Sequence, residues 1–544
     1  MPTGAYCPTG SNTTGAGSAQ VTLDIDLGQG PLQQQFTGSA VQQPALLPIS
    51  DYIYGINNYP ENNYFLNYAK TQFGMMRWGG DAYSAWNWTT NNENNGNDNG
   101  FVNTNQFMPW AYGNDPSDPT YPGNPHDTHP AGALLDGVDS VPAAQARGAA
   151  TLVTISVQSY VAANGSDEKV TYAPSADFTT NSPSASAGSA AIYQDALVQM
   201  LASQNKAPMF YELDNEPNYW RSTHPEVWGG SDTSFDELVA RDAAYAAAIK
   251  HVAPDAIVFG PVIAGVDGMT SLDDYTNLAL TNPYVTSGVD AISYYLAHIG
   301  SASPSRLVDV LDLHYYNDTK DKNGTAKVDA DCVQGPRDYW DPTYSTVDTT
   351  FDDYITGWKP RVIVPRMMAD IAKNFAGTRL AFTEYNNGCE ADIGGGVAEA
   401  DTLGVFGQYG VFAATAWPLQ SVAPGANWLI GAYGAYRNYD GSGATVGSLA
   451  ASSTSSDIAT ASVYGFVAPN GATGAQVVAI NRTTAPVVAE IRLSNACALS
   501  KATAYQLTSA SAAMAPVTGA IAISGNAFTY TLPAMSVTTF ALTP

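Results

Sequence analysis

The sequence predicts an α/β protein in which a (β/α)8 barrel, or TIM barrel, is followed by an antiparallel β-sandwich. Between residues 49 and 428, short apolar runs alternate with helix-length amphipathic stretches, which is typical of a barrel or of a doubly wound open sheet. Polar and acidic residues gather at the carboxyl ends of several runs, where a barrel places its functional side chains, and this favours the barrel. From about residue 430 onward, only short strands separated by Gly, Asn, Ser and Pro remain, and no helix pattern is left.

The first residues of the chain belong to two different segments. Residues 1–18 are rich in Gly, Ser and Thr, and we expect them to be flexible. AQVTLDIDLG at 19–28 alternates apolar and polar residues, which predicts a half-buried strand. This strand precedes the barrel, so we expect the segment 19–48 to join the β-sandwich formed by residues 429–544. Because no Pro- or Thr-rich linker separates the two domains, we expect the sandwich to brace the barrel.

Within the barrel segment, 49–428, each expected strand is a short apolar run and most are followed by an amphipathic stretch. The strands are expected at 52–57, 75–80, 151–156, 209–215, 257–263, 308–316, 380–386 and 414–419. The helices are expected at 62–74, 190–206, 234–252, 362–375 and 399–412.

The charge of the chain limits its partners. Charged residues make up only 13 % of the sequence, and the formal net charge is −27. Nucleic acids and anionic lipids attract basic surfaces, so the charge argues against both. No apolar run reaches the roughly 18 residues that span a bilayer. The start of the chain lacks the basic and apolar stretches of a signal peptide, and we expect an extracellular monomer whose signal has been removed.

Four cysteines are present, and none forms a CxxC pair, which argues against a thiolate zinc site or a redox motif. Cys332 and Cys389 both fall in loops that follow predicted strands. The sequence is compatible with a disulfide between them and equally with two isolated buried thiols.

Two glutamates end strands on opposite sides of the predicted barrel. Glu216 follows strand four in FYELDNEPNYW, and Glu384 ends strand seven in LAFTEYNNG. Because these strand ends lie across the mouth of a barrel, the two carboxylates can face each other over a cleft. Cleavage of a glycosidic bond needs two such carboxylates, one to protonate the leaving oxygen and one at the anomeric carbon. The sequence therefore predicts Glu216 and Glu384 as catalytic residues.

Further motifs follow the predicted strands in chain order, and together they identify a resemblance. They are RWGGDAYSAWNWTTNNENNGND (77–98), ELDNEPNYWRSTHPE (212–226), DLHYY (312–316) and TEYNNG (383–388). In combination these motifs resemble glycoside hydrolase family 44, which contains endoglucanases and xyloglucanases built as a barrel plus a β-sandwich. The glutamates on strands four and seven are similar to those of the wider clan of retaining barrel glycosidases. The resemblance covers most of the chain.

The resemblance implies roles for individual residues. Glu216 is expected to be the acid/base, Glu384 the nucleophile, and Asn215 the residue that hydrogen-bonds the sugar 2-hydroxyl. Arg77 is expected to keep the nucleophile ionised together with a tyrosine, either Tyr316 or Tyr315. This agrees with the chemistry, because a neighbouring guanidinium and a phenol hydrogen bond lower the pKa of a carboxyl group.

Other residues are candidates for contact with substrate. Trp88, Trp220 and Trp417 lie beside loops that follow strands, where tryptophan stacks on the flat faces of sugar rings. The alternative for each is ordinary core packing. His314 on strand six is either a core histidine or part of a sugar subsite.

Metal binding is weakly indicated. His126 and His129 have the spacing of metal ligands, but their Pro-rich surroundings favour a solvated loop. The Asp- and Asn-rich stretches near 91–99 and 136–139 offer oxygen ligands that suit calcium. We expect no organic cofactor, and a structural calcium ion is the metal that the sequence leaves open.

The sequence as a whole predicts an endo-acting, retaining hydrolase of a β-1,4-glucan, either cellulose-type or xyloglucan. A hydrolase of another β-linked polysaccharide, such as mannan or xylan, is the alternative within the same chemistry. A polysaccharide-binding protein without activity is the alternative from another class, and the intact Glu216 and Glu384 argue against it.

Overall fold

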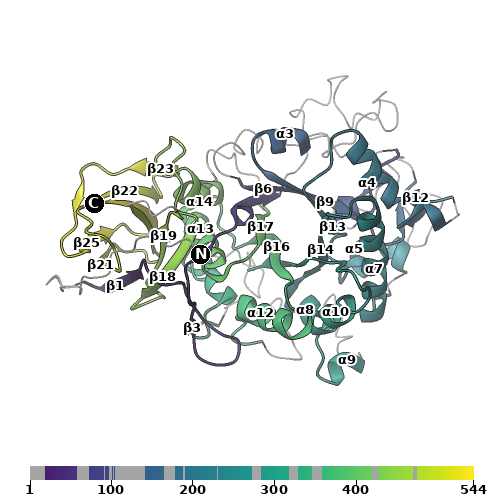
Figure 1. Cartoon of the computed structure of the whole chain (residues 1–544), viewed down its shortest axis with the longest axis horizontal. Helices are drawn as coiled ribbons and strands as arrows, with labels where there is room; N and C mark the ends of the chain where they lie inside the picture. The colour runs from purple at the N-terminus through teal and green to yellow at the C-terminus, as the bar shows by residue number, and fades with distance from the viewer. Residues whose placement is uncertain are drawn as a thin grey trace.

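The computed structural model describes most of the chain: residues 19–57, 73–90, 92–96, 101, 103–104, 141–163, 178–187, 190–229, 231–272, 283–317, 329–345, 358–418, 427–469 and 474–544. Two bodies stand side by side in Figure 1, a barrel ringed by helices and a smaller domain built of strands.

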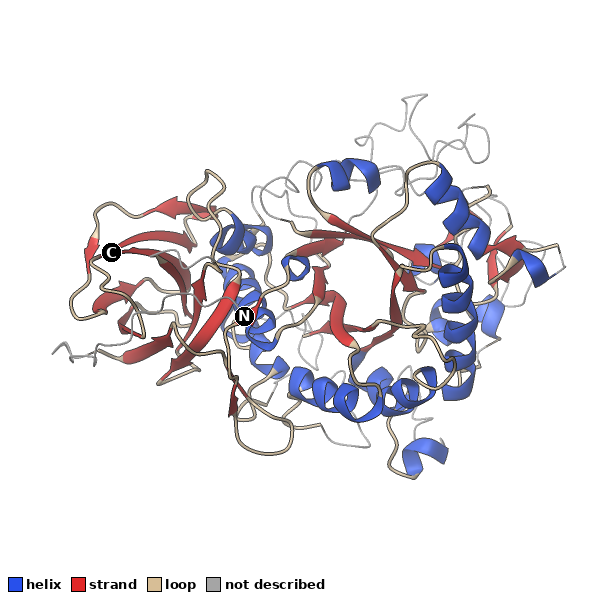
Figure 2. Ribbon diagram, viewed as in Figure 1, coloured by secondary structure: helices blue, strands red, loops and turns tan. Residues whose placement is uncertain are grey.

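The larger body is a closed barrel of parallel strands, as predicted. The strands follow one another in the order β13-β14-β15-β16-β17-β5-β6-β9, and β9 closes back onto β13. Each of the predicted barrel strands is confirmed, and helices surround the barrel (Figure 2). The bounds are β5 (Gly55–Asn57), β6 (Met75–Trp78), β9 (Ala150–Ile155), β13 (Phe210–Leu213), β14 (Ile257–Ala264), β15 (Val310–Tyr316), β16 (Arg379–Asn386) and β17 (Ala413–Ala416).

Four of the predicted helices are confirmed, namely α4 (Gln194–Ser203), α7 (Phe235–Val252), α12 (Ile363–Asn374) and α13 (Ile393–Tyr409). The fifth, at 62–74, lies almost entirely outside the described residues. In α7, the Ser234 side chain accepts a hydrogen bond from the backbone N–H of Glu237, and Lys250 stands in the last turn. A serine cap stabilises the amino end of a helix, and a positive charge stabilises its carboxyl end.

Several helices were not predicted. The longer ones are α8 (Gly265–Ser271), α10 (Ala291–Ile299) and α14 (Trp428–Arg437). Short ones are α2 (Asp81–Ser84), α3 (Val141–Ala146), α5 (Trp220–Thr223), α6 (Pro225–Trp228), α9 (Pro283–Thr286) and α11 (Asp329–Cys332). Helix α14 corrects the expectation that no helix follows residue 430. Its sequence, WLIGAYGAYR, is buried over most of its length between α13 and the sandwich, so it lacks the polar face that reveals a helix.

The smaller body is the predicted β-sandwich, and its strands form one continuous path, β23-β22-β26-β20-β19-β18-β1-β21-β25. Strand β1 joins it, as predicted for 19–28. Because β1 lies antiparallel to β18 but parallel to β21, the sheet is not antiparallel throughout. The bounds are β1 (Val21–Asp26), β4 (Leu47–Pro48), β18 (Leu449–Ser455), β19 (Ala461–Val467), β20 (Ala475–Asn481), β21 (Val487–Ser494), β22 (Lys501–Thr508), β23 (Ser511–Pro516), β24 (Ile521–Ala522), β25 (Ala527–Leu532) and β26 (Ser536–Thr543).

The two bodies share a packed, partly charged interface. Helices α13 and α14 of the barrel lie against β22, β23 and β26 of the sandwich. Asp401 on α13 forms an ion pair with Arg482 of the sandwich, and both side chains are 0 % exposed. Ser462 and Tyr464 on β19 donate hydrogen bonds to the same carboxylate. These contacts match the expected bracing role.

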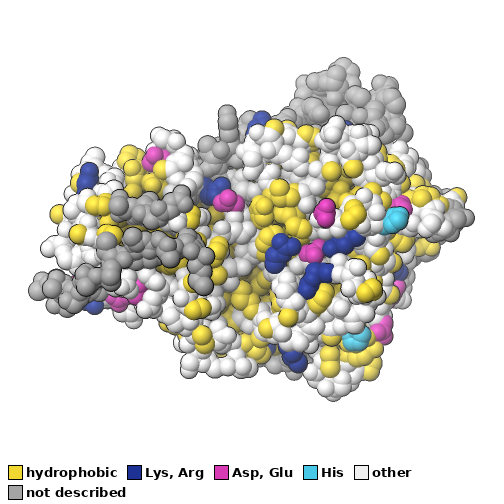
Figure 3. Space-filling model, viewed as in Figure 1, with side chains coloured by type: hydrophobic (Ala, Val, Ile, Leu, Met, Phe, Trp, Pro, Cys, Tyr) yellow, Lys and Arg dark blue, Asp and Glu magenta, His cyan; other side chains and the backbone are white. Residues whose placement is uncertain are grey.

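The face of the molecule drawn in Figure 3 carries few charges. Charged side chains are sparse there among hydrophobic and uncharged polar ones. Within the described ranges, no helix combines the length and the apolar character needed to cross a membrane.

Candidate active site

Polar residues stand in layers above an apolar floor inside the barrel. The floor includes Met75, Leu152, Phe210, Phe259, Val310 and Ala381. Two residues further along their strands, Arg77 follows Met75, Glu212 follows Phe210, and Asp312 follows Val310. Because side chains alternate along a strand, these three point into the barrel as well, one layer closer to its mouth.

A β-bulge on β16 brings the predicted nucleophile into the barrel. Leu313 pairs with Phe382 and His314 pairs with Glu384, so Thr383 is an extra residue between the two pairs. An extra residue of this kind re-aims the side chains next to it. Both Thr383 and Glu384 consequently face the interior, while the Tyr385 hydroxyl donates to Glu399 on α13, outside the barrel.

Glu384 is held from two sides. Arg77 Nη1 donates to its Oε1 at 2.7 Å, and the Tyr316 hydroxyl donates to its Oε2 at 2.7 Å. Burial raises the pKa of Glu384 above its ordinary value, while Arg77 and Tyr316 act in the opposite direction. The prediction of a lowered pKa is therefore wrong in its net direction, because desolvation outweighs the two stabilising contacts.

The predicted acid/base stands on a tight turn after β13. Asp214 and Glu216 both adopt left-handed backbone angles, with φ of 61° and 43°, which are uncommon for residues other than glycine. The Asp214 carboxylate accepts backbone hydrogen bonds from Val157, Gln158 and Asn215, and these fix the turn. Burial raises the pKa of Asp214 to about 6.

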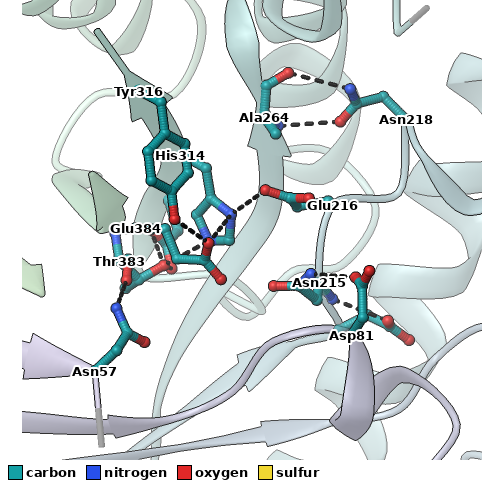
Figure 4. Close-up of polar contacts among 12 residues, drawn as sticks. Asn57, Asp81, Asn215, Glu216, Asn218, Ala264, His314, Tyr316, Thr383 and Glu384 are labelled. Carbon is teal, nitrogen blue, oxygen red and sulfur yellow. Dashed lines mark hydrogen bonds and ion pairs between the residues drawn. The ribbon is translucent and has the colours of Figure 1, made fainter. Parts of the chain in front are cut away.

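The two glutamates meet where the sequence predicted. A carboxylate oxygen of Glu216, one of Glu384 and a ring nitrogen of His314 all lie within 4.8 Å of one another (Figure 4). His314 Nδ1 lies 2.8 Å from Glu216 Oε1 and 3.6 Å from Glu384 Oε2. Burial and the charge of Arg77 lower the pKa of His314 well below its ordinary value, so the ring between the carboxylates is neutral.

Asn215 is oriented before any ligand binds. Its Oδ1 accepts from Arg77 Nη2 at 2.9 Å, and its Nδ2 donates to Asp81 at 2.7 Å. Trp220 Nε1 donates to the Asn215 backbone carbonyl at 3.0 Å. These contacts place the Asn215 amide beside Glu216 at the mouth of the barrel (Figure 4).

Two predicted substrate contacts are corrected. Trp220 is 1 % exposed and stacks on Trp228, so it supports Asn215 from below and has no face free for a sugar. Tyr315 is 0 % exposed and points away from Glu384, because neighbouring residues of a strand alternate; its hydroxyl contacts Asp338 and Arg361. Of the two tyrosines offered as partners of the nucleophile, Tyr316 is the one in contact.

Trp88 and Trp417 are half-buried, and their contact with substrate stays a prediction. The Trp417 ring lies over Gly80, the second of the two glycines after β6, where an added Cβ would lie 3.0 Å from the ring. Trp88 Nε1 donates to the backbone carbonyl of Tyr193 at 3.2 Å.

Sequence reasoning missed the buried residues that support the site. Glu212 receives Arg77 Nε at 2.8 Å, and Asn57 accepts from Arg77 Nη1 at 3.0 Å while donating to the Thr383 carbonyl. Asp312 accepts from Thr383. The alternation of side chains along a strand could have revealed Asp312. It lies two residues before His314 and four before Tyr316 on the same strand, so all three side chains face the same side.

The loops after β15 and β16 are covalently joined. Cys332 and Cys389 form a disulfide with an S–S distance of 2.08 Å, which decides between the two alternatives left by the sequence.

Metal binding outside this site stays a prediction. His126, His129 and the stretch 136–139 lie outside the described residues, and calcium binding near 91–99 is untested. In the part of the chain that the structure describes, the side chains spaced closely enough to share an ion are those of Glu216, His314 and Glu384. The positively charged Arg77 guanidinium lies 2.7 Å from Glu384 and would repel a metal ion bound there. We therefore assign Glu216, His314 and Glu384 to acid–base chemistry.

An eight-stranded barrel with facing glutamates at the ends of its fourth and seventh strands defines the class of barrel glycoside hydrolases. The sequence profile of glycoside hydrolase family 44 matches residues 164–319. Endoglucanase A of Paenibacillus lautus is 30 % identical over 420 residues, which cover 72 % of this chain and 58 % of that protein. β-Mannanase/endoglucanase A of Caldicellulosiruptor saccharolyticus is 30 % identical over 476 residues, which cover 80 % of this chain and 33 % of that protein.

A solved structure agrees over nearly the whole length. A family 44 xyloglucanase of Paenibacillus polymyxa, determined with xyloglucan, has a TM-score of 0.78 and 28 % identity, covering 96 % of this chain and 99 % of that one. This chain belongs to glycoside hydrolase family 44. It spans little more than half of one curated relative and a third of the other.

Proposed function

We propose that this chain is an endo-acting glycoside hydrolase that cleaves a β-1,4-glucan by double displacement with retention of configuration. One observation carries the proposal: carboxylate oxygens of Glu216 and Glu384 lie within 4.8 Å of each other. Retaining glycosidases hold their carboxyl groups about 5–5.5 Å apart, whereas inverting ones need more than about 6.5 Å to admit a water molecule.

The two glutamates divide the chemistry between them. Glu384 attacks the anomeric carbon while Glu216 gives its proton to the leaving oxygen, which breaks the glycosidic bond and leaves the sugar esterified to Glu384. Glu216 then removes a proton from a water molecule, and the resulting attack at the anomeric carbon releases Glu384. No organic cofactor is needed, because both carboxyl groups belong to the chain.

The surrounding residues prepare each step. Arg77 and Tyr316 hold the Glu384 carboxylate at a fixed angle, so its attack costs little reorganisation. The Asn215 amide, fixed by Arg77 and Asp81, is placed to hydrogen-bond a sugar hydroxyl beside the anomeric carbon. This contact would strengthen in the transition state.

The substrate that fits best is a neutral glucan, either xyloglucan or a cellulose-type chain. A net charge of −27 disfavours an acidic polymer. The relatives support a glucan, since two of them are named as an endoglucanase and a xyloglucanase. Mannan is the second candidate, because another relative is named β-mannanase/endoglucanase.

We infer that the protein acts outside the cell. A polysaccharide is too large to enter a cell before it is cut, and the Cys332–Cys389 disulfide is typical of an oxidising environment.

The experiment is an assay of reducing-sugar release from xyloglucan, carboxymethyl-cellulose, mannan and xylan, with Glu384→Gln and Glu216→Gln as matched variants. We expect release from a glucan and a loss of at least about 10³-fold in Glu384→Gln, because an amide is a poor nucleophile. Release from mannan or xylan alone would change the assigned substrate but leave the proposed mechanism in place. Normal turnover by Glu384→Gln would refute the mechanism.

A further inference from the structure

A chain of hydrogen bonds runs from Glu216 at the barrel mouth to a buried carboxyl group below it. Glu216 Oε1 lies 2.8 Å from His314 Nδ1, and Nε2 of the same ring lies 3.2 Å from Thr383 Oγ1 (Figure 4). Thr383 Oγ1 lies 2.8 Å from each carboxyl oxygen of Asp312. His314, Thr383 and Asp312 are each 0 % exposed, so bulk water does not reach these links.

In every hydrogen bond of this chain, either partner can be the donor. A hydroxyl group and a neutral imidazole each donate one hydrogen bond and accept another. When Glu216 carries the proton, it donates to His314 Nδ1, Nε2–H donates to Thr383, and Thr383 donates to the Asp312 carboxylate. When Asp312 carries the proton, all three bonds reverse, and His314 Nδ1–H donates to the Glu216 carboxylate.

We propose that Asp312, Thr383 and His314 form a proton relay for Glu216, in which Asp312 holds the proton between turnovers and receives it back after Glu216 has taken a proton from water. To load Glu216, the O–H bond of Asp312 breaks as a new O–H bond forms on Thr383. The original Thr383 O–H bond breaks as N–H forms at His314 Nε2, and Nδ1–H breaks as O–H forms on Glu216. One proton and one negative charge change places, and no other reagent takes part.

The surroundings of Asp312 suit a proton store. Burial, together with the neighbouring Glu212 carboxylate, raises the pKa of Asp312 well above its ordinary value against the opposing charge of Arg77. His314 does not retain the proton itself, since burial and Arg77 lower its pKa. The charged groups that face the relay are therefore Glu212 and Arg77 beside Asp312, and Glu384 beside His314.

The bulge on β16 is what completes the relay. In a regular strand Thr383 and Glu384 would face opposite sides, and either the nucleophile or the hydroxyl link would be lost from the interior. The relay rests on the proposed function, because it has a purpose only if Glu216 delivers a proton to the leaving oxygen. It makes Asp312, Thr383 and His314 positioning residues that act through Glu216.

The test uses Thr383→Val, which removes the hydroxyl at nearly constant volume, and Thr383→Ser, which retains it. The pH profile of kcat/KM is measured on a glucan polymer whose leaving group needs a proton. We expect the basic limb of Thr383→Val to move to lower pH by about one unit or more, with about a tenfold loss at neutral pH. Thr383→Ser should restore the wild-type limb, and Asp312→Asn should behave like Thr383→Val.

A second substrate separates proton supply from structural damage. An aryl glycoside with an acidic phenol as leaving group needs no proton, so Thr383→Val should release the phenol in a first-turnover burst at close to the wild-type rate. An unchanged basic limb in Thr383→Val, or an equal loss on both substrates, would overturn the relay. Glu216→Gln is assayed in parallel; full polymer activity in that variant would instead overturn the proposed function.

Discussion

Arg77 is the residue that joins the two halves of the site. Its guanidinium contacts Glu212 at 2.8 Å, Glu384 at 2.7 Å, Asn215 at 2.9 Å and Asn57 at 3.0 Å, and the side chain is 0 % exposed. Only the planar fork of arginine offers donors in the directions that these partners require. One side chain thereby sets the position of the proposed nucleophile, Glu384, and of the Asn215 amide beside the proposed acid/base.

Tyr316→Phe tests how the nucleophile is kept ionised. Removing the phenol takes away one of the two contacts that oppose the burial-raised pKa of Glu384, so this pKa should rise further. Catalysis needs the ionised form, and the acid limb of the pH profile of kcat/KM should therefore move to higher pH. A hydrogen bond to a charged group contributes about 1.5–3 kcal/mol, which corresponds to a loss of roughly 10- to 150-fold below the new limb.

The matched control for this prediction is Tyr315→Phe, the neighbouring tyrosine that faces away from Glu384. It should leave the acid limb in place. If both variants shifted the limb equally, or if neither did, the contact between Tyr316 and Glu384 would not govern the ionisation of the nucleophile.

At the level of elements, the strands could be predicted and the bulge could not. Each barrel strand is a short apolar run, and that pattern was enough to place all of them. The bulge at Thr383 could not be predicted from LAFTEYN, because a regular strand could have the same sequence pattern. Helix α14 was missed for a related reason, since a helix buried on most sides loses its periodicity.

The positions of Glu216 and Glu384 at the barrel mouth were predictable, because side chains at the carboxyl ends of barrel strands face the mouth whatever the detailed packing. Whether an aromatic side chain is buried or faces the barrel mouth could not be predicted. Trp220 and Trp417 both follow barrel strands, yet one is buried under Asn215 and the other lies at the mouth over Gly80. The difference depends on contacts made by residues distant along the chain, since Trp220 packs on Trp228 and the Trp417 ring lies over Gly80.

The disulfide between the loops after β15 and β16 should stabilise the fold. Cys332 and Cys389 are 57 residues apart in sequence, and closing a loop of this length restricts the unfolded chain. Replacing both by serine should lower the free energy of unfolding by about 2–4 kcal/mol. Guanidinium unfolding under non-reducing conditions measures this change, and kcat should also fall because the joined loops follow Tyr316 and Glu384. An unchanged midpoint would show that packing alone holds the two loops.

At the scale of the whole molecule, a buried interface joins the sandwich to the barrel. Asp401 and Arg482 pair across the interface with both side chains fully buried, and Tyr464 and Ser462 complete the contact. A buried charge without its partner is strongly unfavourable, so separation of the two bodies would expose or orphan this pair. This agrees with the absence of a linker-like composition between them.

The molecule should be more stable at pH 5 than at pH 8. Burial raises the pKa of Asp242 and that of Glu399 to about 8 each. In the unfolded chain these carboxyl groups have pKa values of about 4. Between that pH and the folded pKa values, the folded state binds more protons than the unfolded state, so the free energy of unfolding falls as the pH rises. Thermal melts across the range should show a lower Tm at the alkaline end.

Neutral replacements give the control for this pH dependence. Glu399→Gln and Asp242→Asn cannot ionise and should flatten the slope of Tm against pH, whereas Asp255→Asn, at an exposed turn, should leave it unchanged. A Tm that rises steadily from pH 5 to pH 8 in the wild type would contradict the assignment of these two buried acids.

The separation between Glu216 and Glu384 is tested most directly by the configuration of the first product. Proton NMR recorded during the opening minutes of glucan hydrolysis distinguishes the α- from the β-anomer before mutarotation mixes them. With carboxylate oxygens within 4.8 Å, Glu384 attacks the sugar itself, and the β-anomer should appear first. First appearance of the α-anomer would show a single displacement by water and would contradict the role assigned to Glu384.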